Sequence, residues 1–334
     1  MSNALRSALA VASLCCTALP ALAEPAADPA SECPTFFPDF SCERQGRYEG
    51  FIAPMTMPYL FEEPFITTGV SAYGIWHEFP NDSAFQGGDA WVVALQARVA
   101  ITDRLGLIAT KDGVAITHPD DSSQLHDETG LFDISAGLKY ALIDRPKDNF
   151  ILTPSLRFEV PTGQHDVYSG HGDGVAIPAI STGWGIGDFH VLADLGAQLP
   201  FTDEQSTSIF YNLHLDYRIW KWLTPFFDLN GMHYTASGNG DINVKTKSFG
   251  AVDLSVAQDV LYAAKITQHK RWEGYDVVNL GSEGVAGNDV VTVAFGGRIP
   301  ITKRVSFGAA YEFPVTPRED IFDQRVTMNV LAEF

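Results

Sequence analysis

The chain has 334 residues, of which 22 are Lys or Arg and 41 are Asp or Glu, and its formal net charge is −19 at pH 7. This acidity argues against nucleic acids and anionic lipid surfaces as partners, because both carry negative charge themselves. No apolar run approaches the roughly 18 residues of a membrane-spanning helix, which argues against an integral protein of the cytoplasmic membrane.

Residues 1–23 are predicted to form a secretory signal peptide. Arg6 precedes an apolar run over residues 8–19, and the small-residue cleavage site Ala21-Leu22-Ala23 follows it. Cys15 and Cys16 lie inside this signal without the small residue that precedes a lipoprotein cysteine, so we expect no lipid anchor.

Residues 24–64 show no sustained period and contain several prolines, many aromatic side chains and the pair Cys33 and Cys42. An even number of cysteines in an exported chain predicts a disulfide between these two residues, with two free thiols as the alternative. The aromatic content is too high for a solvated tail. We therefore expect this segment to pack on the rest of the chain, which is predicted to be a β-barrel over residues 65–334, either inside it as a plug or under its periplasmic rim.

Residues 65–334 carry the two-residue alternation of β-strands and are predicted to form one domain. One expected strand follows a tight turn at residues 102–104. The other expected strands cover residues 65–79, 91–101, 132–142, 150–160, 189–199, 209–219, 225–234, 248–261, 290–299, 305–315 and 325–334. The total of twelve suits a closed barrel, with ten or fourteen as alternatives.

Two similar turns set the expected topology, at residues 98–104 and 298–304. Outer-membrane barrels have short turns on the periplasmic side and longer loops outside, so both turns should face the periplasm. The Gly-rich residues 162–187 are then expected as a long external loop, and the turn at Trp220 should also be external. Pro154 cannot donate to a strand ladder and requires a bulge or an unpaired position.

The last strand shows which face should meet lipid. Val326, Met328 and Val330 alternate with Arg325 and Thr327, and the other strands repeat this pattern. A soluble sandwich also has one apolar face per strand, but strands of about ten residues favour an antiparallel up-and-down transmembrane β-barrel. The apolar faces should point to lipid and the polar faces into a crowded or wet lumen.

The terminal Phe334 lies in register with the apolar face of the last strand. In this it resembles the C-terminal assembly signal of bacterial outer-membrane barrels. The resemblance implies the barrel assembly machinery of a Gram-negative bacterium as a partner, and the outer membrane as the location.

The inward-facing rows supply the candidate lumen-lining residues. In a functional interpretation their charges set the field that a small-molecule solute meets, whereas in a purely structural one they pair and neutralise one another. The candidates are Arg98, Lys139, Arg157, Glu159, Asp194, His214, Asp216, Arg218, Arg298, Glu312 and Arg325.

Enzyme and metal chemistry find little support in the sequence. The only His followed two residues later by a hydroxyl is His233 with Thr235, which is a poor nucleophile for a lipid hydrolase. His165 and His171 lie close to acidic residues, but a solvated loop is the simpler interpretation. We expect no enzyme, no metal and no cofactor. The acidic loops could bind divalent cations that bridge lipopolysaccharide, or simply keep the loops soluble.

The alternating strands, Val160-Pro161-Thr162-Gly163 before a Gly-rich loop, the glycines of residues 183–187 and the closing hairpin together resemble a known group over residues 131–334. It is the outer-membrane barrel family of meta-pathway phenol-degradation proteins. The resemblance implies porin-like passive transport of small solutes, including small aromatic or apolar compounds. The first third of the chain, with its Cys pair and proline-rich segment, departs from the family pattern. The alternatives are a structural or surface-recognition barrel without transport and a soluble secreted β-protein.

Overall fold

The computed structural model describes residues 47–48, 50–238, 243–247, 250–253, 285–302, 304–319 and 322–334. These residues belong to one compact unit, Cys33–Phe334. The predicted signal peptide and the predicted Cys33–Cys42 disulfide lie outside the described residues. Within the described ranges, no helix is both long and apolar enough to cross a membrane.

The described residues form strands joined by turns and loops, with two short 3-10 turns, η1 (Pro146–Asp148) and η2 (His165–Val167). The strands are β1 (Gly69–Glu78), β2 (Gly88–Ala100), β3 (Leu105–Lys111), β4 (Gly113–Pro119), β5 (Glu128–Leu131), β6 (Ile134–Tyr140), β7 (Ile143–Arg145), β8 (Phe150–Val160), β9 (Val175–Ile186), β10 (Phe189–Pro200), β11 (Thr207–Tyr217), β12 (Thr224–Ala236), β13 (Asn243–Thr246), β14 (Gly250–Asp253), β15 (Asp289–Pro300), β16 (Val305–Pro314) and β17 (Gln324–Glu333).

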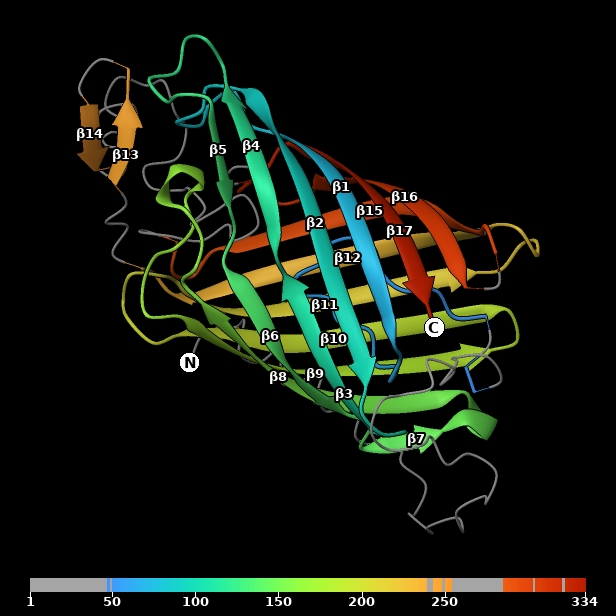
Figure 1. Cartoon of the computed structure of the whole chain (residues 1–334). Coiled ribbons are helices and arrows are strands. Elements are labelled where there is room, and N and C mark those ends of the chain that lie inside the picture. The colour runs from blue at the N-terminus through green and yellow to red at the C-terminus, as the bar shows by residue number, and fades with distance from the viewer. Residues whose placement is uncertain are drawn as a thin grey trace. The chain divides into compact units, whose positions relative to one another are not determined.

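One antiparallel sheet closes on itself, because β1 pairs with β2 on one edge and with β17 on the other. The wall has twelve strand positions. The short strands β3 and β4 share one position, as do β5 and β6, while β7 only extends a hairpin of β8. Figure 1 shows the closed wall and, apart from it, the small sheet of β13 and β14. The prediction of a twelve-stranded antiparallel barrel is confirmed.

One predicted loop and one predicted strand were wrong, and the two errors cancel in the total. Residues 162–187, expected as one loop, contain β9, which pairs with β8 and β10. Of residues 248–261, expected as a wall strand, the described part Gly250–Asp253 is β14, which pairs with β13 in a separate sheet, and in the wall β12 pairs directly with β15. The inclusion of β9 also moves the turn at Trp220 to the same end of the barrel as the turns at residues 101–104 and 301–304.

Glycines at inward positions of β9 interrupt the alternation of apolar and polar side chains that marks the other strands. Gly183 and Gly185 stand at inward positions, where other strands carry a polar side chain. A Cβ on Gly185 would lie 2.9 Å from the ring of Phe51, and one on Gly183 would lie 3.2 Å from Pro64. These positions are glycine because another part of the chain packs against the inside of the wall there.

Pro154 lies where the strand ladder changes partner. On one edge of β8, residues Phe150 to Leu152 pair with β7, and the pairing with β6 starts only at Ser155. Pro154 falls between these two ladders, so its missing N–H breaks neither of them. The predicted unpaired position is confirmed on this edge, while on the other edge Pro154 is in register with Ile180 of β9.

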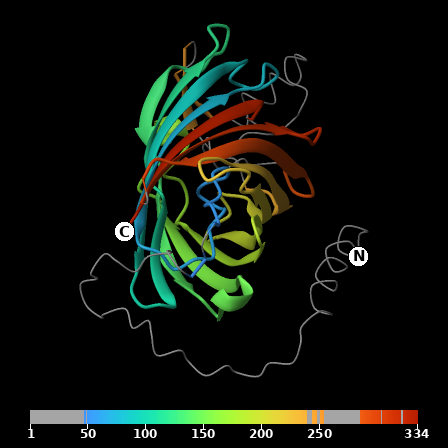
Figure 2. The same ribbon diagram turned by 90° about the vertical axis from the view of Figure 1, so that its right-hand side faces the viewer.

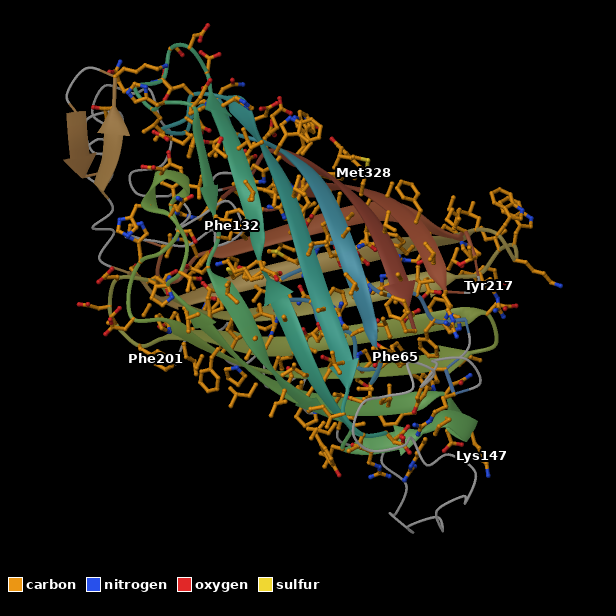
Figure 3. All side chains as sticks on the ribbon, viewed as in Figure 1. Phe65, Phe132, Lys147, Phe201, Tyr217 and Met328 are labelled. Atoms are coloured by element: carbon orange, nitrogen blue, oxygen red, sulfur yellow. The ribbon has the colours of Figure 1, made fainter. Side chains whose placement is uncertain are left out.

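The outer and inner faces of the wall have opposite polarity. Val93 is 61% exposed and Leu95 is 56% exposed on the outside, whereas Gln96 and Arg98 of the same strand are buried inside. Figure 3 shows Met328 of β17 on the outside of the wall. An apolar outer band around a polar interior is the arrangement of an outer-membrane barrel, since lipid cannot solvate backbone or charge. The barrel therefore belongs in an outer membrane.

The two ends of the barrel differ in loop length. The turns at residues 187–188, 218–223 and 301–304 are short and lie at one end, and the longer connections at residues 79–87, 161–174 and 315–323 lie at the other. Figure 3 shows Lys147 and Tyr217 toward the first end and Phe201 toward the second. By the usual rule for such barrels, the end with the short turns faces the periplasm.

Candidate functional site: the lumen and its N-terminal segment

Residues 50–68, here called the N-terminal segment, lie inside the wall. Figure 2 shows them as a blue chain between the strands of the barrel. The segment enters at the periplasmic end, turns back at residues 57–60, and reaches β1 at the same end. The amides of Leu60 and Phe61 both donate to the Met57 carbonyl at 2.9 Å, which closes the turn. Nearly every residue of the segment is buried.

The entrance of the segment is fixed at the periplasmic rim. The Tyr48 hydroxyl donates to Asp144 at 2.6 Å, and the Arg47 guanidinium pairs with the same carboxylate. Burial and the hydrogen bond to Asp144 raise the pKa of the Tyr48 phenol well above its usual value, so the phenol stays protonated at neutral pH. Phe51 then packs on the ring of His190, with 4.3 Å between the ring centroids.

One half of the inner wall, from β2 to β8, is basic, and it holds the returning part of the segment. Arg98 contacts both oxygens of Glu62, at 2.9 Å and 2.8 Å. Lys139 donates to Glu62 at 2.6 Å and to the Glu63 carbonyl at 3.0 Å. Arg157 donates to the carbonyls of Tyr59 and Leu60. We call this part of the wall the basic half.

The opposite half of the wall, from β10 to β16, is acidic. His214 lies between two carboxylates, 2.5 Å from Asp228 and 3.3 Å from Asp216. His190 lies 2.7 Å from the other oxygen of Asp216. A neutral imidazole has only one N–H, so His214 can donate to both neighbours only when it is protonated. This acidic half contacts the segment at Thr56, whose hydroxyl donates to Asp228 at 2.7 Å, and at Glu62, whose amide donates to Asp194 at 3.2 Å.

The polar chain continues from the acidic half toward the outer end of the barrel. Asn230 donates to Thr56 at 2.9 Å and to Glu312 at 3.1 Å. Glu312 lies 3.6 Å from Arg325, which contacts His77 at 3.1 Å. Buried polar groups therefore follow the inner wall from the periplasmic end to the external end, and the segment is part of this network.

Most predicted lumen-lining residues lie where the alternation placed them. Ten of them are buried on the inner face, namely Arg98, Lys139, Arg157, Glu159, Asp194, His214, Asp216, Arg298, Glu312 and Arg325. The structure places Arg218 elsewhere, beyond the last residue of β11, where its exposed side chain pairs with Asp188 at 2.5 Å.

Several residues of the network were not among the candidates. Lys111 pairs with Glu159 at 2.8 Å, and Asp228, Asn230 and His190 also belong to the inner face. Their alternation in β3, β10 and β12 was the available signal. Glu62, in contrast, lies in a stretch without period, so no local pattern identified it.

Aromatic side chains fill the external end of the lumen. Phe79 and Phe85 stack with 4.1 Å between ring centroids, and Tyr168 meets Phe85 at 5.4 Å. Phe322 meets the ring of His77 at 5.4 Å. These rings are buried and come from three of the long connections, so the loops cover this end as the segment fills the other.

The histidines considered for metal binding or lipid hydrolysis make other contacts in the structure. His165 and His171 stack on each other at 4.3 Å, with His165 bonded to the Gly170 carbonyl. Among the described residues, no group of three or more His, Cys, Asp or Glu side chains could hold a metal. His233 pairs with Asp289 at 2.7 Å, and the hydroxyl of Thr235 donates to a backbone carbonyl.

No family model matches the chain, and no curated protein matches it. Among solved structures, it is similar to an outer-membrane channel from Pseudomonas putida F1, at 15% identity over 85% of this chain and 100% of that chain, with a TM-score of 0.49. The KdgM porin aligns at 10% identity over 79% of this chain and 99% of that chain, with a TM-score of 0.41. Outer membrane phospholipase A from Escherichia coli aligns at 12% identity over 80% and 92%, with a TM-score of 0.37. These likenesses concern the fold alone.

Proposed function

We propose that this protein is an outer-membrane channel through which small solutes diffuse passively, and that the N-terminal segment closes it. One observation carries this proposal. The wall encloses a space wide enough for a chain that enters, turns and returns, and, apart from its continuation into β1, that chain is held in the lumen by hydrogen bonds and ion pairs. Displacement of the segment leaves a passage, whereas an eight-stranded barrel is filled by its own side chains.

The aromatic side chains of the segment support a more specific cargo. Phe51, Tyr59, Phe61 and Phe65 are all buried within the barrel. The lumen therefore accommodates aromatic rings, and a small aromatic or apolar solute would occupy the space that they leave. The resemblance to the meta-pathway phenol-degradation proteins points to the same class of solute.

The test is single-channel current in planar bilayers. We expect the wild-type protein to conduct weakly and a Phe51→Ala/Tyr59→Ala variant to conduct more, because two rings are removed from the path. Phe189→Ala is the matched control, since Phe189 lies on the outer face of β10 and is 38% exposed. Benzyl alcohol should interrupt the current more often than glycerol at equal concentration.

A structural or surface-recognition barrel would behave differently. It would give no current in the wild type or in the variant, although both preparations showed the heat-modifiable gel mobility of a folded barrel. Equal interruption by benzyl alcohol and glycerol would leave a channel without preference for aromatic solutes.

A further inference from the structure

The two halves of the inner wall differ in where their charges find partners. The carboxylates of the acidic half contact imidazole, hydroxyl, amide and guanidinium groups of the wall itself, as in the pairs Asp216–His190, Asp228–His214 and Glu312–Arg325. The acidic half would therefore keep most of its partners if the N-terminal segment left the lumen.

The basic half depends on the segment. Within the described residues, every carboxylate within 4.0 Å of Arg98 or Lys139 belongs to Glu62 or Glu63 of the segment. Arg157 donates to two carbonyls of the segment's turn and to the hydroxyl of Thr110. The side chains of Arg98, Lys139 and Glu62 are each at most 8% exposed.

Opening of the channel therefore has an electrostatic consequence. When the segment moves, Arg98 and Lys139 lose the carboxylate that pairs with them and Arg157 loses two carbonyl acceptors, and breaking a buried ion pair is strongly unfavourable. Water can replace part of the loss. A carboxylate replaces all of it, because a guanidinium binds two carboxylate oxygens at once and an ammonium adds a third contact. Arg98 and Lys139 already hold Glu62 in this way.

We infer that Arg98, Lys139 and Arg157 form a carboxylate-binding site for the transported solute, and that Glu62 occupies this site while the channel is closed. The inference rests on the channel function proposed above and names the chemical class of its cargo. The cargo is a small organic acid that carries a carboxylate on an aromatic or apolar body.

The arrangement of the wall provides room for that body. Arg98, Ile108, Gly137 and Arg157 stand on one registered row across β2, β3, β6 and β8. An apolar side chain and a glycine thus separate the two guanidinium groups along the wall. A carboxylate held at Arg98 and Lys139 can place its apolar part against Ile108, which is fully buried.

Chemical rescue tests the site directly. In Glu62→Ala, the atoms removed are the Cγ methylene and the carboxylate, and propionate supplies both with one further methyl group. Addition of about 50 mM propionate should raise the folding yield and the unfolding temperature of this variant, because a ligand that binds only the folded state stabilises it. Propanamide, which is neutral and of the same shape, should have little effect. Thr56→Ala, a substitution elsewhere in the segment, should not respond to propionate.

Equal effects of propionate and propanamide on Glu62→Ala would overturn the site. The comparison remains decisive if Glu62→Ala folds poorly alone, because the folding yield in each solute is itself the measurement. A Glu62→Ala/Lys139→Gln variant should lose most of the rescue, since one of the two side chains that hold the carboxylate is gone.

Ion selectivity tests the cargo. Glu62→Gln should shift the reversal potential in a KCl gradient toward anions, with an anion-to-cation permeability ratio at least about threefold above that of the wild type. Benzoate should then interrupt the current more often than benzamide, its neutral counterpart. An unchanged permeability ratio, or equal interruption by benzoate and benzamide, would contradict the organic-acid cargo without contradicting the channel function. Absence of current in every folded variant would overturn the channel and its cargo, and the rescue experiment would still decide the site.

Discussion

The sulfur of Met55 lies where a side chain on Gly308 of β16 would begin. Met55 is fully buried in the N-terminal segment, and Gly308 is the inner-face residue opposite it. The fit of the segment against this wall therefore depends on the absence of a side chain at one position. Glycine is required there for close approach and not for an unusual backbone angle.

Gly308→Ala should loosen the segment. The added methyl group forces Met55 to move, and an overpacked core position costs on the order of 1 kcal/mol when the neighbour is a flexible methionine. We expect a higher single-channel conductance and faster proteolysis within residues 47–62, with the barrel still folded. Limited proteolysis followed by mass spectrometry measures the second effect.

Gly106→Ala is the matched control for this prediction. Gly106 also faces inward, but a Cβ there would meet Lys139 at 3.5 Å, an ordinary contact distance. If both variants were proteolysed like the wild type, the close approach of Met55 to Gly308 would not be what seats the segment.

The alternation of residues predicted the wall well wherever the inner and outer side chains differ in kind. In β2, Trp91, Val93 and Leu95 face out and Gln96 and Arg98 face in, as the pattern indicates. The alternation is lost in β9 because glycines replace inner side chains there, where Phe51 and Pro64 pack against the wall. A strand whose inner face is shaped by a distant segment carries no sign of it in its own sequence.

The candidate site was predictable in part for the same reason. Inner charged residues such as Arg98 follow from the strand period. Their partner Glu62 does not, because it lies in an aperiodic stretch 36 residues from Arg98 and 77 residues from Lys139. Only folding brings these groups together, so the sequence identified the cations of the lumen without the anion that holds them.

The orientation of β17 can be tested with two neighbouring substitutions. Val330 is 44% exposed on the outer face, whereas Asn329 is buried and bonded to Arg298 at 2.8 Å. Val330→Asp places a charge against lipid and should reduce the free energy of folding into vesicles by about 1–2 kcal/mol, less than a basic residue would. Asn329→Asp keeps its charge beside a guanidinium and should cost less. Folding titrations in urea compare the two, and equal costs would contradict the assigned faces.

The external loop at residues 315–323 should respond to pH. Burial and the nearby carboxylates raise the pKa of Glu319 and of Asp323 above the usual range for acids. Phe322, between them in sequence, is fully buried, and the amide of Asp323 donates to the Glu78 carbonyl at 3.1 Å. With Phe322 buried and Asp323 bonded to Glu78, the loop is docked on the barrel. Its acidic groups bind protons more readily in this docked state than they would in a loop released from the barrel.

The raised pKa values of Glu319 and Asp323 determine in which direction the docking of this loop changes with pH. The docked loop binds protons more readily, so docking is most stable below the usual carboxyl pKa of about 4 and loses this contribution as the pH rises through the raised values. Conductance should therefore be lower with the external side at about pH 4 than at about pH 7. Asp323→Asn should flatten this dependence and lower the conductance at neutral pH. A conductance that falls as the pH rises would contradict the proposed docking.

Tyr48→Phe should weaken the attachment of the segment at the periplasmic rim. The substitution removes the hydrogen bond to Asp144 and keeps the ring, which packs against Phe65 at 5.2 Å, so the expected cost is about 1 kcal/mol. Proteolysis at Arg47 should become faster. Tyr140→Phe, on the outer face of β6, is the control.

The raised pKa of the Tyr48 phenol predicts a second pH effect, at alkaline pH. Because its pKa is raised in the folded state, the contribution of Tyr48 is complete below the usual phenol pKa of about 10 and is lost as the pH rises further. The wild type should become as sensitive to proteolysis as Tyr48→Phe only in that alkaline range, while the variant changes little. If the two proteins kept their difference throughout the titration, ionisation of Tyr48 would not govern the attachment at the rim.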